Sequence, residues 1–149
     1  MAEILVVDDD EALGKRICAL LSWDGHRVRW AVNAREGLSL HTKHPADLIV
    51  TEIYLPGMNG LELISVLRHR GDNVQIIALS RGYQRMSEEL SLMLAKCKGA
   101  FAAFSKPVSV ENLRSVVKAA LGGQPTPSIV ASKRFGRSET DYEVSGWRA

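Results

Sequence analysis

Cysteine is scarce in this chain of 149 residues, which contains only Cys18 and Cys97. Each lies in a segment with helical periodicity, and the two are not spaced like the ligands of a metal site. This scarcity argues against a disulfide framework and a zinc site. We expect both residues to be reduced, inert thiols packed inside the protein.

Long apolar runs are also missing. No stretch approaches the roughly 20 apolar residues that cross a bilayer, and the first residues lack the basic and apolar segments of a secretory signal. The net charge of +2 is close to balance, which argues against a protein that mainly coats nucleic acid or an anionic membrane. These absences predict a soluble, cytoplasmic protein without a nucleic-acid or membrane partner.

The apolar residues that are present, 46% of the chain, suffice for one well-packed domain. Short apolar runs alternate with longer amphipathic stretches, a pattern typical of repeated strand and helix units in a parallel sheet. The expected strands are residues 3–7, 26 or 27–31, 47–51, 74–79 and 100–104. The expected helices are residues 11–23, 34–44, 60–70, 85–98 and 110–121. The second strand alternates polar and apolar residues, which predicts an edge strand.

Helix-capping residues and a change in composition agree with these boundaries. Asn33 and Ser109 are placed as helix N-caps. From Gly122 onward the sequence reads Gly-Gly-Gln-Pro-Thr-Pro and has no sustained apolar period. We therefore expect a domain over residues 1–121 and a flexible tail over residues 122–149 without an independent fold.

Polar residues stand where four of the expected strands end. They are Asp8, Asp9, Glu52, Ser80 and Lys106. Because ligands gather beyond the carboxyl ends of parallel strands, we expect these residues to converge. Three carboxylates brought together require a cation, a proton or a basic side chain. Magnesium with Lys106, and Ser80 as a hydroxyl donor, would form a phosphoryl-transfer site.

These residues resemble the receiver domains of two-component response regulators, over about residues 2–121. Ile4-Leu-Val-Val-Asp-Asp9 is similar to the acidic-pair motif of that family, and the segment 47–60, Asp-Leu-Ile-Val-Thr-Glu-Ile-Tyr-Leu-Pro-Gly-Met-Asn-Gly, to its phosphoacceptor loop. Ser80 matches the hydroxyl switch position, and Lys106-Pro107 the lysine with its cis proline. Each motif alone is weak, but the four occur in order and at the right spacing.

The resemblance implies an α/β fold: a five-stranded parallel sheet of order 2-1-3-4-5 in a flavodoxin-like (CheY-like) three-layer sandwich with five helices. It implies magnesium bound by Asp8 or Asp9, by residue 52 and by the backbone carbonyl of Tyr54. It also implies phosphorylation by a histidine kinase. The expected partner surface comprises the fourth helix, fifth strand and fifth helix, and homodimerisation stays open.

Glu52 departs from the family, whose phosphoacceptor is an aspartate. The extra carbon moves the carboxylate outward by about 1.5 Å, and phosphoryl transfer is sensitive to such shifts. Two interpretations stay open. Glu52 is a partial mimic of phosphoaspartate that reaches toward Ser80 and Lys106, or it marks a decayed site whose charge Lys106 neutralises.

Arg81 and Ala103 are two further departures. The family usually has a small residue at position 81, and a guanidinium there would pair with Glu52 or Asp9, block phosphodonor entry and replace the charge of a metal. An arginine pointing to solvent is the alternative. Ala103 stands where the family has an aromatic switch, and alanine has no rotamer to report a movement of Ser80.

Three aromatic residues are candidates for a partial substitute of that switch: Phe101, Phe104 and Tyr83. Ordinary core packing is the alternative for the two phenylalanines.

The resulting hypothesis is a stand-alone, atypical receiver that signals by contact with a histidine kinase or another signalling protein. Magnesium binding is weak or absent, and no enzyme activity is expected beyond the receiver's own phosphorylation chemistry. The alternative is a functional phosphorelay response regulator that accepts phosphate from a histidine kinase. A nucleotide-binding protein is disfavoured because no glycine-rich loop follows the first strand.

Overall fold

The computed structural model describes residues 1–81 and 87–123, in which strands and helices alternate. The strands are β1 (Glu3–Val7), β2 (Arg27–Ala31), β3 (Leu48–Glu52), β4 (Gln75–Ser80) and β5 (Ala102–Ser105). The helices are α1 (Glu11–Trp23), α2 (Ala34–Lys43), α3 (Gly60–His69), α4 (Glu88–Cys97) and α5 (Val110–Leu121).

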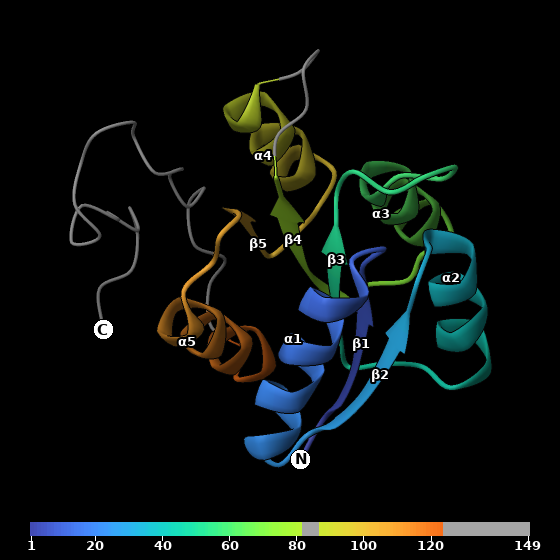
Figure 1. Ribbon diagram of the computed structural model, residues 1–149. Helices are drawn as coiled ribbons and strands as arrows, with labels where there is room; N and C mark the ends of the chain where they lie inside the picture. The colour runs from blue at the N-terminus through green and yellow to red at the C-terminus, as the bar shows by residue number, and fades with distance from the viewer. Residues whose placement is uncertain (82–86, 124–149) are drawn as a thin grey trace, which may run out of the picture.

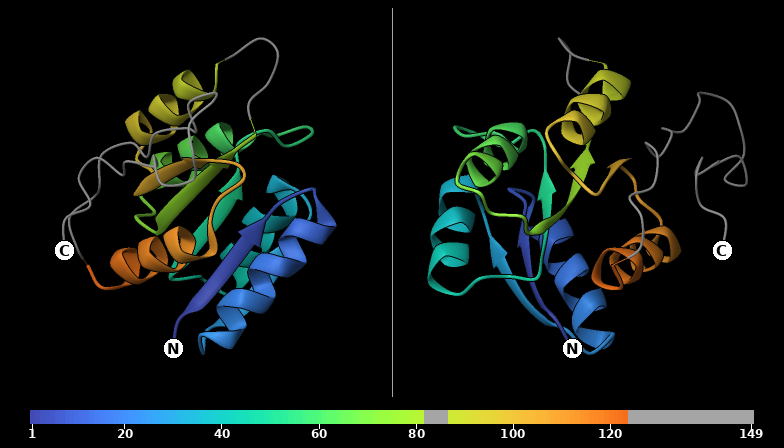
Figure 2. Two further views of the ribbon diagram at one scale, coloured as in Figure 1. Left: turned by 60° about the vertical axis from the view of Figure 1, so that its left-hand side comes forward. Right: turned by 180° about the vertical axis from the view of Figure 1, so that it is seen from behind.

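The strands form one sheet of order β2-β1-β3-β4-β5, and every neighbouring pair is parallel. Helices α1 and α5 cover one face of the sheet, and α2, α3 and α4 cover the other (Figures 1 and 2). The predicted three-layer, flavodoxin-like fold is confirmed, as is the edge position of β2. Because all the strands run in one direction, their carboxyl ends lie along one edge of the sheet.

Successive strand residues face opposite layers, so each apolar strand supplies two hydrophobic cores. In β1, Leu5 and Val7 belong to the core beneath α2, α3 and α4. Ile4 and Val6 belong to the core beneath α1 and α5. Burial on both faces explains why the central strands are apolar at almost every position.

Side-chain N-caps mark where the helices begin. Asn33 and Ser109 cap α2 and α5 as predicted, each accepting a backbone N–H in the first turn. Helix α4 begins at Glu88, later than the predicted residue 85, because Ser87 has an extended backbone and its side chain caps the helix. Glu52 is the last residue of β3 rather than the residue after it.

The expectation that both cysteines are packed is wrong for Cys97, which is exposed, while Cys18 is half-buried. Leu92 and Ala95 are buried on the inner face of α4. Cys97 follows Ala95 by two residues and so points away from that face. Burial raises the pKa of the Cys18 thiol, as expected for an inert residue.

Two further predictions concern the rest of the chain. The expected tail covers residues 122–149, of which residues 124–149 lie outside the described residues, as does Tyr83. Within the described part, no helix is both long enough and apolar enough to span a bilayer.

Candidate functional site

The sheet's carboxyl edge brings the predicted residues together. Asp8 directly follows β1, Glu52 and Ser80 end β3 and β4, and Lys106 directly follows β5. The backbone N–H of Lys106 donates to the carbonyl of Ser80 at 2.7 Å. Asp8, Glu52 and Ser80 are completely buried. The site is thus built from strand ends that are distant in sequence.

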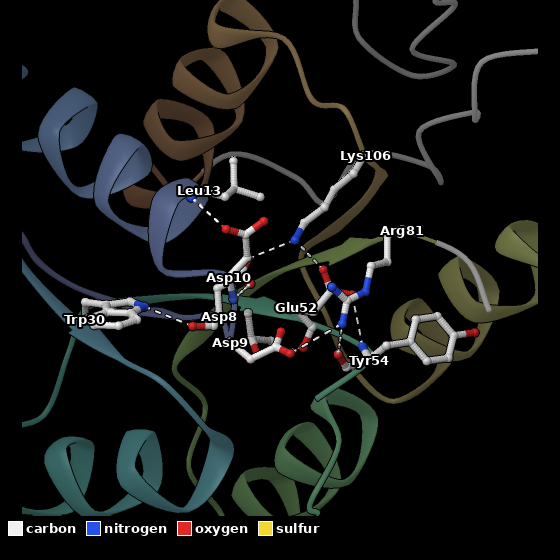
Figure 3. Close-up of polar contacts among 10 residues, drawn as sticks. Asp8, Asp9, Asp10, Leu13, Trp30, Glu52, Tyr54, Arg81 and Lys106 are labelled. Atoms are coloured by element: carbon white, nitrogen blue, oxygen red, sulfur yellow. Dashed lines mark hydrogen bonds and ion pairs between the residues drawn. The ribbon is translucent and has the colours of Figure 1, made fainter. Parts of the chain in front are cut away.

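Lys106 lies between two buried carboxylates (Figure 3). Its Nζ is 2.8 Å from Asp8 Oδ2 and 2.5 Å from Glu52 Oε2, and the lysine side chain is only 12% exposed. The Oε2 atom has no aligned hydrogen bond, so its contact with the lysine is one of charge. Buried carboxylates need such compensation, because an unpaired charge away from water is strongly destabilising.

Backbone and side-chain donors hold the rest of Asp8. The N–H of Asp10 donates to Asp8 Oδ1 at 2.9 Å, and the indole N–H of Trp30 donates to the carbonyl of Asp8 at 3.0 Å. The Asp10 carboxylate instead accepts the N–H of Leu13 and caps α1. The third aspartate of the acidic run therefore caps the helix with its side chain and contacts the site only through its backbone N–H.

Arg81 reaches back across the site from the end of β4. Its Nη2 is 3.4 Å from Asp9 Oδ2 and 3.2 Å from the carbonyl oxygen of Tyr54. Of the two carboxylates considered for it, Arg81 therefore pairs with Asp9. The other oxygen of Asp9 is buried without a hydrogen-bond partner. Both contacts use a side chain that is 46% exposed, so solvent screens them more than those of Lys106.

Tyr54 connects this site to α4, a contact that was not predicted from the sequence. Its N–H donates to Glu52 Oε1 at 3.0 Å, and its hydroxyl forms a short hydrogen bond with the Ser91 hydroxyl on α4. A signal was present in the sequence: Ser91 lies between apolar residues on the inner stripe of the predicted fourth helix. A polar residue on such a stripe requires a buried partner.

Gly60 allows α3 to begin against the site. A Cβ at this position would lie 2.2 Å from the carbonyl oxygen of Glu52 and 2.8 Å from Ile53 Cα. The Gly60 N–H also donates to the Ile53 carbonyl at 2.7 Å. Glycine is therefore required by close backbone packing just after Glu52.

Ala103 is completely buried in β5, within the core beneath α2, α3 and α4. Phe101 and Phe104 are buried in the opposite core, beneath α1 and α5. Their positions match the core-packing alternative, and neither lies in the same layer as Ala103. The Lys106-Pro107 peptide bond is cis, as the resemblance implied.

The expected magnesium ligands are divided between two side-chain cations. Lys106 contacts Asp8 and Glu52, while Arg81 contacts Asp9 and the carbonyl of Tyr54. Across residues 1–81 and 87–123, no group of three or more His, Cys, Asp or Glu side chains is arranged to hold a metal ion. The side chains and the carbonyl expected to bind magnesium are thus paired with Lys106 and Arg81.

Comparisons with known proteins match most of the described chain. The family model of the response regulator receiver domain matches residues 4–118 of this chain. The response regulator MprA of Mycolicibacterium vanbaalenii is 34% identical over 141 residues, which are 95% of this chain and 59% of MprA. Sporulation initiation phosphotransferase F of Bacillus subtilis is 28% identical over 117 residues, which are 78% of this chain and 90% of that protein.

A solved structure shows the same fold. The receiver domain protein of Clostridium thermocellum superposes with a TM-score of 0.75 at 27% identity, over 83% of this chain and 96% of that one. The chain spans less than two thirds of MprA, so this comparison concerns only part of that protein. Matching motifs, strand order and a family match over most of the sequence lead to one conclusion: the chain belongs to the receiver-domain family of two-component response regulators.

Proposed function

We propose that this protein is an atypical receiver that signals by protein contact and in which position 52 no longer accepts phosphate. The observation that carries the proposal is the buried contact between Glu52 and Lys106, at 2.5 Å. An acceptor carboxylate must present a free oxygen to the phosphodonor. Here Oε2 is paired with Lys106 and Oε1 accepts the N–H of Tyr54, while the side chain is completely buried.

Receiver domains generally bind magnesium at the phosphorylation site. For this chain we propose weak or absent binding, because the Arg81 guanidinium lies against two of the expected ligands. Magnesium demands near-octahedral oxygen coordination and gives up its waters reluctantly. Displacing Arg81 would add to the cost of binding.

Both interpretations of Glu52 are compatible with its contact to Lys106. A phosphomimetic carboxylate would reach the lysine and bias the domain toward an active-like state. A decayed acceptor would be neutralised by the same contact. Comparing partner binding by the wild type and Glu52→Gln separates them, since only mimicry requires the charge.

Receiver domains interact with histidine kinases and other signalling proteins. We place the partner surface of this chain on α4, β5 and α5. Three large apolar side chains are about half exposed there: Leu90, Met93 and Val110, at 45%, 51% and 47%. Exposed apolar residues on α4 and α5 suit a protein partner, either a signalling protein or a second copy of this chain.

The test is incubation with acetyl phosphate and magnesium, followed by intact-mass measurement. We expect no phosphoryl adduct on the wild type. Glu52→Asp shortens the side chain and loosens its pairing with Lys106, and combining it with Arg81→Ala also opens the Asp9 side of the site. We expect the double variant to be labelled most. Glu52→Gln is the matched control without a nucleophile.

The second candidate is a functional phosphorelay receiver that accepts phosphate on Glu52. Two observations favour it. All the predicted motif residues converge at one edge of the sheet. In addition, one relative, of whose length this chain covers 90%, is named a phosphotransferase. A Glu52 adduct at high occupancy in the wild type would establish this candidate and refute the first.

A further inference from the structure

We infer that Tyr54 couples the buried Glu52 and Lys106 pair to α4, in place of an aromatic switch at position 103. The inference rests on the proposed function in one respect: α4 belongs to the surface that meets the partner. The inference names the contacts through which a change at the Glu52 and Lys106 pair is transmitted to the α4 surface.

At the site, both backbone polar groups of Tyr54 are engaged. Its N–H donates to Glu52 Oε1 at 3.0 Å, and its carbonyl accepts from Arg81 Nη2 at 3.2 Å. A change in the charge or position of either side chain therefore acts directly on the Tyr54 backbone. The tyrosine ring points away from the acidic cluster, as Figure 3 shows.

At the other end, the Tyr54 hydroxyl meets α4 at its first turns. It hydrogen-bonds the hydroxyl of Ser91, which is completely buried. Ser91 in turn donates to the carbonyl of Ser87, at 3.2 Å. A serine hydroxyl has a single proton, so Ser91 accepts from Tyr54 when it donates to Ser87. The route ends at the N-cap, because the Ser87 side chain accepts the N–H of Leu90.

The packing of Tyr54 explains how a change at the site would move α4. Tyr54 packs against the core that contains Ala103, Leu92 and Ala95, and so lies in the layer where alanine offers no movable side chain. Leu90 lies one residue before Ser91 and Met93 two residues after it, and both are about half exposed. A shift of α4 driven through Ser91 would therefore change how these apolar side chains are presented to a partner.

The test is a cycle of Glu52→Gln and Tyr54→Phe, read by hydrogen exchange of the α4 amides without any phosphodonor. Tyr54→Phe removes the hydroxyl and retains the ring and the backbone contacts. We expect Glu52→Gln to change the exchange rates of the α4 amides by about threefold or more when Tyr54 is present. In the Tyr54→Phe background, the change in the logarithm of the rate should be less than half as large. A structural role alone would shift exchange in both backgrounds equally.

Controls make the outcome decisive. Ser91→Ala should abolish the response as Tyr54→Phe does. Thr42→Ala, which removes a hydroxyl that donates to Leu38 on distant α2, should leave it intact. If Glu52→Gln does not fold, Arg81→Ala replaces it in the cycle, because that variant removes the hydrogen bond from Arg81 to the Tyr54 carbonyl. An equal response in both backgrounds, or no response with Tyr54 present, overturns the inference. A phosphoryl adduct would instead refute only the proposed function.

Discussion

At the scale of single residues, burial decides which ion pair matters. Lys106 is 12% exposed and its two carboxylate partners are buried, whereas the Arg81 side chain is 46% exposed. Exposed pairs contribute about 0–1 kcal/mol. Removing one partner of a buried pair costs about 3–5 kcal/mol, because a charge is left without compensation. Lys106 is therefore expected to stabilise the site, and Arg81 mainly to control access to it.

Replacing Lys106 tests this difference. Lys106→Met keeps the aliphatic stem but leaves Asp8 and Glu52 without their shared cation, so the free energy of unfolding should fall by about 3–5 kcal/mol. Urea denaturation measures it. Lys118→Met, at an exposed position of α5, is the matched control and should change stability by less than about 0.5 kcal/mol. Equal losses in the two variants would contradict the assigned role.

At the scale of elements, a histidine and an aspartate join α2 to the segment before β4. His41 on α2 is buried, and its Nε2 lies 2.7 Å from Asp72 Oδ2. Its Nδ1 accepts the N–H of Ala46 at 3.0 Å, so a neutral ring carries its proton on Nε2 and donates to Asp72. The other carboxylate oxygen accepts the N–H of Val74. One carboxylate thus fixes two connections between helix and strand.

This arrangement predicts a pH dependence. Burial alone would raise the pKa of Asp72, but hydrogen bonds from Val74 and His41, with the charge of Arg68, outweigh it and hold the pKa below its usual value. The unfolded chain therefore binds the proton more readily. The stabilising contribution is complete above the unfolded pKa of about 3.9 and is lost as pH falls through the lower folded pKa.

Asp72→Asn keeps an acceptor for His41 and removes the charge. We expect the free energy of unfolding to drop by about 1 kcal/mol at neutral pH, the difference between a charged and a neutral hydrogen bond. Urea titrations across the acid range should show this gap closing below about pH 3.9. A gap that stays constant over the whole range would show that the charge is not responsible.

At the scale of the whole molecule, two cores share one sheet, and α5 closes the second of them. Leu113, Val116 and Val117 of α5 pack in the same core as β1, β3 and β5. Arg114 also pairs with Asp24, just after α1, through two contacts of 2.9 Å. Both cores are assembled from residues up to Leu121 within the described part of the chain.

Truncation tests whether the domain is complete at this point. A chain ending at Gly123 retains all the core residues that lie in the described part of the chain, and its thermal midpoint should lie within about 2 °C of that of the full chain. Scanning calorimetry of the two proteins measures the difference. A decrease of more than about 5 °C would show that residues 124–149 stabilise the domain and would contradict the expected tail.

Much of the fold could be predicted from the sequence, because its signals are local. Apolar runs marked the strands, helical stripes marked the helices, and Asn33 and Ser109 marked caps. Predictions were weaker where a boundary depends on a single backbone conformation, as at Ser87 before α4. The prediction that Cys97 is buried was wrong, because a difference of two positions along a helix turns a side chain from the inner face to the outer one.

By itself, the sequence determined the parallel sheet, the receiver family and the convergence of strand-end residues, because periodicity and strand direction fix where a side chain stands along each element. Only the tertiary structure decided the pairing: Lys106 with Asp8 and Glu52, Arg81 with Asp9 rather than Glu52, and Tyr54 with Ser91. These contacts join segments far apart in the chain, so they depend on distances and rotamers that emerge only when the layers pack.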